Sequence, residues 1–344
     1  MTHASSTAAI ADLVAPAPGE MRAIAAGVYW LRMPLPFALD HINLWVLDDG
    51  EGWVIIDTGI ATVDVRDAWQ RLFVGPLAGR RPRHLICTHF HPDHMGLAGW
   101  LCDRWGMPMS ATLGEWAFGR MLAIEDDETL RGTALAFYRR AGFDDARLQL
   151  VAERGNAYRR RVEPIPSSFR RLRDGDVFDI DGRSWRVIVG LGHSPEHASL
   201  YCAETGVLIA GDQVLPRISP NISVWPQEPG ADPLRLYLAS LKRFADLPAE
   251  TLVLPSHHAP FIGLRGRLAE LAHHHDARLA DTLALCSTPR TAADLLERLF
   301  RRQLDDHQVF FAVGEALAHL HYLERNNTLR RFADANGREM FVRD

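Results

Sequence analysis

Cysteine, lysine and long apolar runs are scarce in this sequence. The four cysteines, Cys87, Cys102, Cys202 and Cys286, are scattered without a Cys-x-x-Cys pair, which favours reduced thiols over a disulfide framework. No stretch approaches the ~20 consecutive apolar residues that span a bilayer, so we expect no membrane association. The first 20 residues lack a basic start followed by an apolar core and do not resemble a secretory signal. We therefore expect a cytoplasmic protein in which residues 1–20 form a mobile tail.

The charge balance argues against a polyanionic partner. Lys242 is the single lysine, and the other non-histidine basic residues are arginines spread along the chain. The formal net charge of the 344 residues is −5 at pH 7, and between residues 289 and 344 nine arginines stand against nine acidic residues. Such a balance is poorly suited to duplex phosphates or an anionic membrane. We expect a small-molecule substrate, with neither nucleic acid nor a membrane as partner.

Strand and helix signals alternate along the chain, which favours a layered α/β fold. At 344 residues the chain exceeds the ~100 to 200 residues of one domain, so about two domains are expected. Two β-rich runs, 42–47 and 53–56, flank a turn-forming stretch and predict a hairpin. Further helices are expected over 63–73 and 96–105, and further strands over 28–31, 84–88, 169–172, 177–180, 184–189, 207–212 and 252–254.

The most informative stretch follows the predicted strand 84–88 and contains four potential metal ligands. His89 and His91 are two positions apart, so their imidazoles point the same way on extended backbone. Pro92 ends the strand and lets Asp93 and His94 turn toward the same volume. Imidazole and carboxylate suit zinc, with iron and manganese as alternatives. The run therefore predicts a metal site at the end of this strand.

This run resembles the His-x-His-x-Asp-His signature of the metallo-β-lactamase superfamily. The resemblance implies a four-layer αβ/βα sandwich and three further ligands at later strand ends. His193, in Gly-Leu-Gly-His, resembles the third histidine motif, and Asp212, which ends an apolar strand, resembles the metal-bridging aspartate. The family pattern Pro-Gly-His selects His257 in Pro-Ser-His-His, although His258 could compete for that role.

Two other polar residues match the superfamily without a clear ligand role. Asp57, in Asp-Thr-Gly, resembles an Asp-x-Gly at a tight turn near the metal site, where a turn role and a catalytic role both stay open. His197 resembles a histidine that is buried without metal contact. Cys87 should face away from Thr88 on a strand, so we place it in the core.

The resemblance implies two metal ions, most simply Zn²⁺ with Fe or Mn as alternatives. One ion would be held by His89, His91 and His193, the other by Asp93, His94 and His257, with Asp212 and a water or hydroxide shared. Two cations about 3.5 to 4 Å apart lower the pKa of bound water to about 7. Asp93 has a second expected role, in which it orients the hydroxide and delivers a proton to the leaving group.

Two segments depart from the alternating pattern. Residues 114–168 read as a charge-rich helical insert, which is either solvated or a lid that closes over the substrate with four aromatic side chains, Trp116, Phe118, Phe137 and Tyr138. We expect the metallo-β-lactamase-fold domain over 21–262 and a C-terminal module over 263–344. Its helices and terminal hairpin resemble a small winged-helix domain, with a packing, homodimer or pocket-wall role. Three adjacent histidines, 273–275, fan out on a helix, so we expect them to be solvated.

A bridging aspartate together with a sixth ligand resembles the glyoxalase II, lactonase and phosphodiesterase branches more than the true β-lactamases. The sequence therefore predicts a dinuclear metal-dependent hydrolase that cleaves a small or acyl-chain thioester, ester or lactone, similar to hydroxyacylglutathione hydrolases or lactonases. Two alternatives stay open, a nucleic-acid phosphodiester hydrolase and a non-catalytic metal-binding sensor of the same fold.

Overall fold

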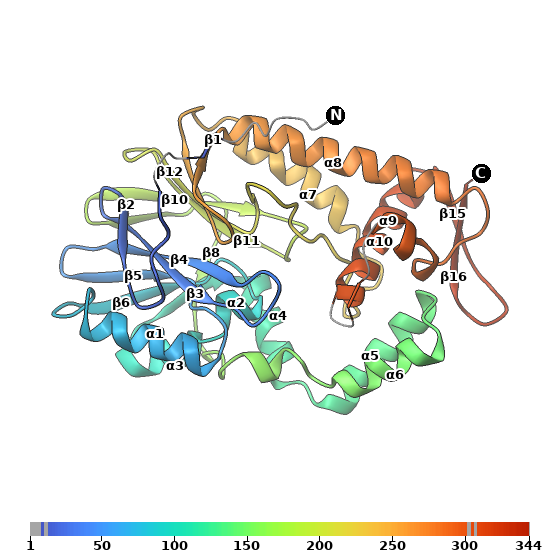
Figure 1. Ribbon diagram of the computed structural model, residues 1–344, viewed down its shortest axis with the longest axis horizontal. Coiled ribbons are helices and arrows are strands. Elements are labelled where there is room, and N and C mark those ends of the chain that lie inside the picture. Colours follow the sequence, from blue (N-terminus) through green and yellow to red (C-terminus); the bar gives the residue numbers. More distant parts are fainter. Residues whose placement is uncertain (1–7, 10–12, 301–303, 306–307, 344) are drawn as a thin grey trace. The chain divides into compact units, whose positions relative to one another are not determined.

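The computed structural model describes residues 8–9, 13–300, 304–305 and 308–343 (Figure 1). The chain forms two compact units. Unit 1 comprises Met1–Ile124, Tyr158–Pro220 and Leu241–Leu268, and unit 2 comprises Glu125–Ala157, Asn221–Ser240 and Ala269–Asp344. The sequence-based boundary at residue 262 does not coincide with this division, because residues 125–157 and 221–240 pack with the C-terminal stretch.

Unit 1 contains two seven-stranded sheets. The first sheet has the strand order β2-β3-β4-β5-β6-β7-β8, and its pairing changes from antiparallel to parallel at β5. Its strands are β2 (Arg22–Ala25), β3 (Val28–Pro34), β4 (His41–Asp48), β5 (Gly52–Ile56), β6 (Arg81–Ile86), β7 (Met109–Thr112) and β8 (Arg170–Leu172). The predicted hairpin is confirmed as β4 and β5.

The second sheet has the strand order β1-β14-β13-β12-β11-β10-β9. Its strands are β1 (Ala8–Ala9), β9 (Val177–Ile180), β10 (Arg183–Gly190), β11 (His197–Cys202), β12 (Val207–Gly211), β13 (Leu252–Pro255) and β14 (Phe261–Ile262). Only β12 and β13 run parallel among these pairs. Within the predicted N-terminal tail, Ala8–Ala9 pairs with β14, and residues 1–7 and 10–12 lie outside the described residues.

A shared apolar core joins the two sheets. Trp30 and Trp45 from the first sheet stack with ring centroids 6.1 Å apart and belong to one buried cluster with Trp185 and Val187 of the second. Alternate residues of a strand face opposite sides, so each sheet directs one set of apolar side chains inward. Helices α1 (Val63–Val74) and α3 (Ala98–Trp105) pack on the first sheet (Figure 1). The predicted α/β sandwich is confirmed.

Unit 2 is mainly helical and ends in a two-stranded sheet. Its hairpin, β15 (Leu329–Ala333) and β16 (Glu339–Arg343), is antiparallel, as predicted. The other helices among the described residues are α2 (Pro92–Met95), α4 (Leu113–Ile124), α5 (Asp127–Arg140), α6 (Asp145–Arg154), η1 (Arg159–Arg161), α7 (Pro233–Leu241), η2 (Lys242–Phe244), α8 (Leu264–Leu285), η3 (Ala293–Leu295), α9 (Leu296–Leu299) and α10 (Gln308–Arg325).

The predicted insert is helical, but residues 125–157 belong to unit 2, whereas both ends of the insert belong to unit 1. In unit 2, Tyr138 is only 8% exposed, stacks on Phe143 at 5.0 Å and meets Phe310 edge-on at 5.2 Å. Phe137 on the same helix is 4% exposed. These contacts contradict solvation only near the end of α5, because both aromatic side chains help to form the core of unit 2, whereas most of the helix is exposed.

The other two proposed lid residues pack within unit 1. Trp116 on α4 stacks on Phe169 with ring centroids 4.3 Å apart, and Phe118 meets Phe90 edge-on at 4.9 Å. Their rings therefore already have aromatic neighbours. The lid interpretation gains no support from these contacts.

The expectation of three solvated histidines in α8 is wrong at His275. His273 is exposed, whereas His275 is fully buried, with its Nδ1 3.3 Å from Nε2 of His319. Tyr237 packs against the His275 ring at 5.5 Å. Adjacent helical residues do fan out, as expected, but one of the three directions faces the interior of unit 2.

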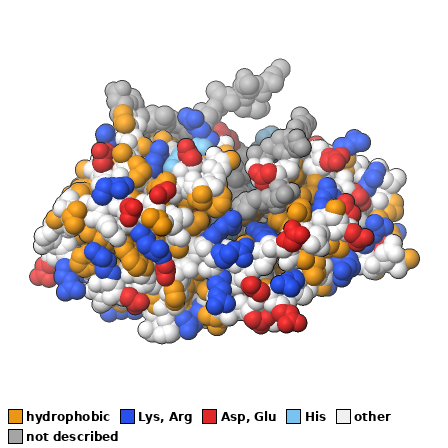
Figure 2. Space-filling view, turned by 60° about the horizontal axis from the view of Figure 1, so that its bottom comes forward, with side chains coloured by type: hydrophobic (Ala, Val, Ile, Leu, Met, Phe, Trp, Pro, Cys, Tyr) orange, Lys and Arg blue, Asp and Glu red, His pale blue; other side chains and the backbone are white. Residues whose placement is uncertain are grey.

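The surface agrees with the balanced composition. Over the described part of the face in Figure 2, arginine and acidic side chains are interspersed, without an extended patch of one sign. None of the helices that the structure describes combines the length and apolarity needed to cross a membrane.

Candidate metal centre

The site begins where β6 ends, at Ile86. The chain continues to His91, whose backbone is still extended at φ −54° and ψ 148°, and the short helix α2 starts at Pro92. Proline is well suited to the first helical position because its fixed φ matches the helix and no hydrogen bond needs its missing N–H. Pro92 therefore redirects the chain, as predicted, and puts Asp93 and His94 on a helical turn.

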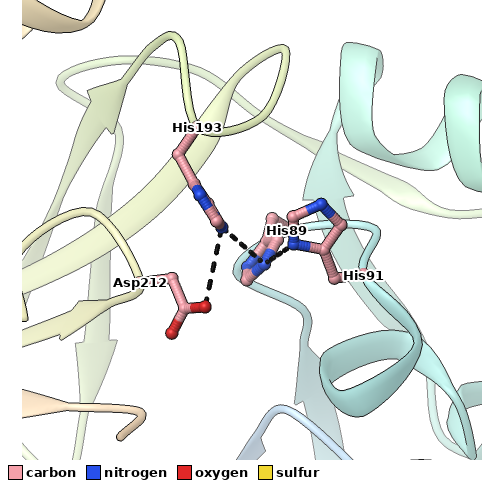
Figure 3. Close-up of side chains that lie close together, drawn as sticks. All are labelled: His89, His91, His193 and Asp212. Carbon is pink, nitrogen blue, oxygen red and sulfur yellow. Dashed lines mark hydrogen bonds and ion pairs between the residues drawn. The ribbon is translucent and has the colours of Figure 1, made fainter. Parts of the chain in front are cut away.

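One group of side chains contains His89, His91, His193 and Asp212, whose ligand-type atoms lie within 4.8 Å of one another (Figure 3). Nε2 of His89 lies 2.8 Å from Nδ1 of His91 and 3.3 Å from Nε2 of His193. Oδ2 of Asp212 lies 3.6 Å from Nε2 of His193. Three imidazoles and one carboxylate thus converge on a small volume; we call these residues group A.

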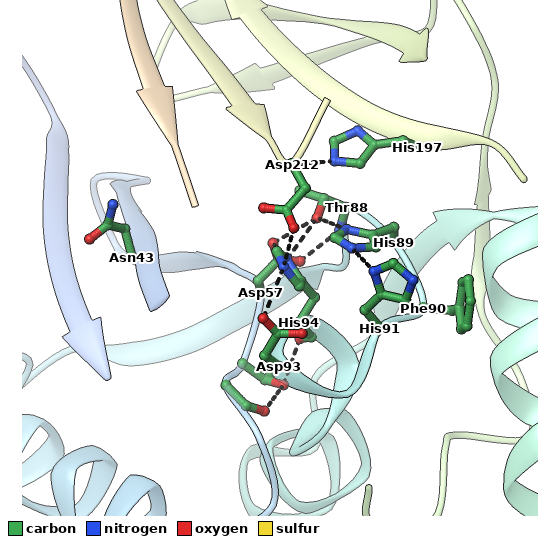
Figure 4. Close-up of polar contacts among 12 residues, drawn as sticks. Asn43, Asp57, Thr88, His89, Phe90, His91, Asp93, His94, His197 and Asp212 are labelled. Atoms are coloured by element: carbon green, nitrogen blue, oxygen red, sulfur yellow. Dashed lines mark hydrogen bonds and ion pairs between the residues drawn. The ribbon is translucent and has the colours of Figure 1, made fainter. Parts of the chain in front are cut away.

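Another group contains Asp93, His94 and His257, also within 4.8 Å of one another; we call these residues group B. Oδ2 of Asp93 lies 3.5 Å from Nε2 of His257 and 3.7 Å from Nε2 of His94. Oδ2 of Asp212 lies 3.4 Å from Nε2 of His257 and 3.7 Å from Nε2 of His94. Asp212 therefore faces both groups (Figure 4).

The two sheets supply different members of the site. His89, His91, Asp93 and His94 follow β6 of the first sheet. The other three residues, His193, Asp212 and His257, follow β10, β12 and β13 of the second sheet. Because β12 and β13 are parallel, their carboxyl ends meet at one edge. The structure brings together all seven predicted residues, although they come from four separate stretches of the sequence.

The electrostatics of group A suit metal binding. Burial lowers the pKa of His89 well below its usual value and that of His91 to about 3, and neighbouring histidines act in the same direction. Imidazoles that stay neutral keep a lone pair for coordination. Burial opposes ionisation of Asp212, but His257 and His94 hold the pKa of Asp212 well below its usual range.

Two buried atoms provide a test of whether a cation fits here. Nε2 of His94 and Oδ1 of Asp212 are buried without a hydrogen-bond partner. A buried acceptor without a partner is costly, and a coordinated cation removes that cost. The donor set of imidazole nitrogens and carboxylate oxygens suits a divalent metal. The residues present therefore fit divalent metal ions.

Asp57 has a role beyond its turn. Its φ of 62° lies in the left-handed region, which few non-glycine residues adopt. Its carboxylate accepts hydrogen bonds from the backbone N–H and from Oγ1 of Thr88, both at 2.7 Å, and lies 2.7 Å from Nδ1 of His94 (Figure 4). The contact at Nδ1 orients the His94 ring so that Nε2 faces group B.

His197 is fully buried and belongs to neither group, as predicted. Its Nε2 accepts a hydrogen bond of 3.1 Å from the backbone N–H of Asp212. A Cβ at Gly211, which has a φ of 55°, would lie 2.4 Å from this nitrogen. His197 and Gly211 thus fix the backbone that carries Asp212.

The structure separates the two adjacent histidines after β13. His257 directs Nε2 into group B, and its Nδ1 lies 3.0 Å from the backbone oxygen of His41. His258 has a φ of 66°, its N–H donates to Nε2 of His41, and its ring meets the His41 ring edge-on at 6.2 Å. His257 is therefore the residue that faces the site.

Two supporting residues were missed by the sequence reasoning. Asn43 donates from Nδ2 to the backbone oxygens of Pro255 and His258, which holds the turn around His257. A lone asparagine inside an apolar strand was a signal that could have identified it. Glu115 is fully buried beside group A, and within its charge-rich segment no local signal distinguishes it.

Comparisons with known proteins give the same picture. The protein family described as "Metallo-beta-lactamase superfamily" matches residues 38–257, and the family described as "Metallo-beta-lactamase-like, C-terminal domain" matches residues 279–344. The Probable metallo-hydrolase YqjP of Bacillus subtilis is 24% identical over 312 residues, which cover 89% of this chain and 95% of that protein. The Acyl-coenzyme A thioesterase MBLAC2 of Homo sapiens is 23% identical over 203 residues, covering 56% of this chain and 65% of that protein. A crystal structure of a Beta-lactamase domain protein from Burkholderia ambifaria has 45% identity and a TM-score of 0.90, and the match covers 97% of both chains.

Proposed function

We propose that this chain, which belongs to the metallo-β-lactamase superfamily, is a dinuclear metallo-hydrolase that cleaves a small or acyl-chain thioester, ester or lactone. The observation that carries the proposal is the position of Asp212. Its Oδ2 lies 3.6 Å from His193 in group A and 3.4 Å from His257 in group B. A carboxylate that faces two ligand groups is placed to bridge two ions.

The proposed ligand sets follow the two groups. His89, His91 and His193 would hold one ion and Asp93, His94 and His257 the other, with Asp212 shared. When bound, two divalent cations supply a nucleophilic water at neutral pH. Zn²⁺ suits these donors best, and Fe or Mn would fit as well.

Asp93 is the proposed catalytic residue of the chain itself. Its Oδ2 lies 3.5 Å from Nε2 of His257, so the carboxylate lies among the ligand atoms of group B and does not merely support a ligand from outside the site. Although burial opposes ionisation, His94 and His257 lower the pKa of Asp93 to about 2. The ionised carboxylate would orient the attacking water, accept a proton from that water as it attacks, and pass this proton to the leaving group.

The proposed substrate class rests on two considerations. A nuclease needs cationic groups along a phosphate backbone, whereas the charges of this chain are balanced. One relative, MBLAC2, is named an acyl-coenzyme A thioesterase, which supports a thioester as the bond cut. Within this class we propose a glyoxalase II-like or lactonase-like enzyme, with a winged-helix-like module over residues 263–344 that packs or dimerises.

A substrate panel tests this proposal. We expect the purified full-length chain to hydrolyse a member of a set of acyl thioesters, aryl esters and lactones, with much slower turnover of bis-p-nitrophenyl phosphate. Turnover can be followed by thiol release, by nitrophenolate absorbance and by acid production. Hydrolysis of the phosphodiester alone, or salt-sensitive binding of oligonucleotides, would favour a nucleic-acid hydrolase. Two bound metals without any turnover would favour a sensor.

We also expect about two metal ions per chain. Six side chains and a shared carboxylate exceed what one tetrahedral ion can use. Elemental analysis of protein purified without chelator, before and after incubation with Zn²⁺, measures this ratio. A reproducible value of one that added metal does not change would contradict the dinuclear assignment.

A further inference from the structure

We propose that Glu115 is a positioning residue for group A. From α4 its carboxylate connects the loop that carries His89 and His91 with the loop that follows β10. The inference rests on the proposed metal-binding role of group A. It adds a residue that belongs to neither ligand group and that no sequence motif indicated.

The geometry of Glu115 uses both carboxylate oxygens. Oε1 accepts hydrogen bonds from Oγ of Ser194 at 2.7 Å and from the backbone N–H of Glu196 at 2.6 Å. Oε2 accepts a hydrogen bond of 2.9 Å from the backbone N–H of Phe90. The side chain is 0% exposed, so water does not compete for these bonds. One carboxylate thus joins two loops that belong to different sheets.

Two of these partners are direct sequence neighbours of group A residues. Phe90 lies between His89 and His91, and Ser194 follows His193. A fixed backbone at Phe90 restrains both flanking imidazoles, because Phe90 is bonded directly to His89 and His91 in the chain. The bonds to Ser194 and Glu196 hold the other loop at the distance that brings His193 to His89.

Additional bonds support the same connection. The carbonyl of Phe90 accepts a 2.6 Å hydrogen bond from the hydroxyl of Tyr158, so both backbone polar groups of Phe90 are held. The carboxylate of Glu196 accepts a 2.8 Å bond from the N–H of Gly114, next to Glu115. Thr112 donates from Oγ1 to the backbone oxygen of Glu196 at 2.8 Å. The start of α4 is thereby fastened to the loop of His193.

The cost of burying this carboxylate indicates a specific role. Burial raises the pKa of Glu115 to about 7, and its hydrogen bonds act in the opposite direction. Three donors directed at two oxygens match an ionised carboxylate, which only accepts. An apolar side chain would leave the N–H of Phe90 buried without an acceptor, which is costly. Because its partners adjoin group A, Glu115 should affect one of the two ions.

The test is Glu115→Gln in the full-length chain. Glutamine keeps the shape but replaces one acceptor with an amide donor, which must face a donor at Phe90 or at Ser194 and Glu196. Metal-free protein would be titrated with Co²⁺ against a chromogenic chelator, and the absorption bands of bound Co²⁺ report each site. We expect a roughly 10- to 100-fold weaker affinity for one ion, the range found for residues that orient metal ligands.

Two backgrounds identify which ion is affected. His257→Ala disrupts group B, and His193→Ala disrupts group A. Glu115→Gln should weaken Co²⁺ binding and shift its absorption bands in the His257→Ala background, and should change the affinity less than about threefold in the His193→Ala background. Equal weakening in both backgrounds, or none in either, would overturn the proposal.

Glu315→Gln is a matched control. Glu315 is largely buried in unit 2, and burial raises its pKa to about 7, as for Glu115, but it belongs to neither ligand group. We expect both Co²⁺ affinities to stay within about twofold of wild type, the scatter of a remote substitution. If Glu315→Gln weakens binding of the same ion equally, the effect of Glu115→Gln would be one that any buried carboxyl group produces, and the positioning role would be refuted.

If Glu115→Gln does not fold, Ser194→Ala replaces it, because it removes one donor and keeps the carboxylate. Ser194→Ala should lower the affinity for the same ion by a smaller factor, and an unchanged affinity would overturn the proposal. The readout is metal affinity, so a wild-type chain that binds two ions without hydrolysing any substrate refutes the proposed function alone. A wild-type chain that binds no metal refutes both.

Discussion

Asp212→Ala should abolish hydrolysis and reduce the metal content of the protein. Its carboxylate lies 3.4 to 3.7 Å from histidines of both groups, so its loss weakens both sites at once. The next residue, Gln213, carries a neutral amide that cannot replace the charge. We expect kcat/KM to fall more than about 1,000-fold, or ~4 kcal/mol in the barrier. Steady-state kinetics on the best substrate and elemental analysis measure the two effects.

Asp103→Ala is the control for this variant. Asp103 is exposed on α3 and belongs to neither ligand group, so its removal tests the loss of an acidic side chain alone. It should keep activity within about twofold, since exposed substitutions usually change little. If Asp212→Ala keeps more than about a tenth of wild-type activity, a barrier change of only ~1.4 kcal/mol, the bridging role would belong to another residue.

His257→Ala should remove most of one metal equivalent and lower activity at least about 100-fold. A loss of about 100-fold is the upper end of the range for residues that only orient metal ligands, and His257 is a proposed ligand itself. The reason is that group B has three side chains besides the shared Asp212, and His257 supplies one of its two imidazoles. Metal analysis after gel filtration, together with kcat and KM, measures the effect.

His258→Asn is the matched comparison. The φ of His258 is 66°, a region that asparagine tolerates better than alanine. Because His258 packs against His41 and not in group B, this variant should keep both metals and change mainly KM and substrate preference. The opposite pattern, with metal lost in His258→Asn and kept in His257→Ala, would show that the second histidine faces the ions.

The sequence was most informative where function and strand ends coincide. Each predicted ligand follows an apolar run, and the position of a polar residue after a buried strand can be read locally. His193, Asp212 and His257 each follow such a run and were selected by their resemblance to the superfamily motifs, and the structure places all three at the ends of strands of one sheet. The hairpin of β4 and β5 was predicted by its turn composition.

Other features depend on contacts that leave no local pattern. Glu115 is paired with Glu196, 81 positions away, and neither sequence neighbourhood indicates the other. The strand β7, Met109–Thr112, is short and contains serine and threonine, so it lacks the alternation of a strand with one solvated face. The burial of His275 and the packing of Tyr138 in unit 2 depend on which other helices and side chains each helix packs against. Periodicity gives an apolar face but not its partner.

The origin of the ligands in both sheets has a thermodynamic consequence. An ion held by group A joins the loop after β6 to the ends of β10 and β12, so it cross-links segments that the unfolded chain cannot hold together. A ligand that binds only the native state stabilises it by about 4 kcal/mol when its free concentration is 1,000 times its Kd. Such a gain is comparable to a large part of the total stability of a domain. Metal supply would then determine how much of the chain stays folded as well as how fast it hydrolyses substrate. Metal starvation would therefore lower the amount of folded protein in addition to its activity.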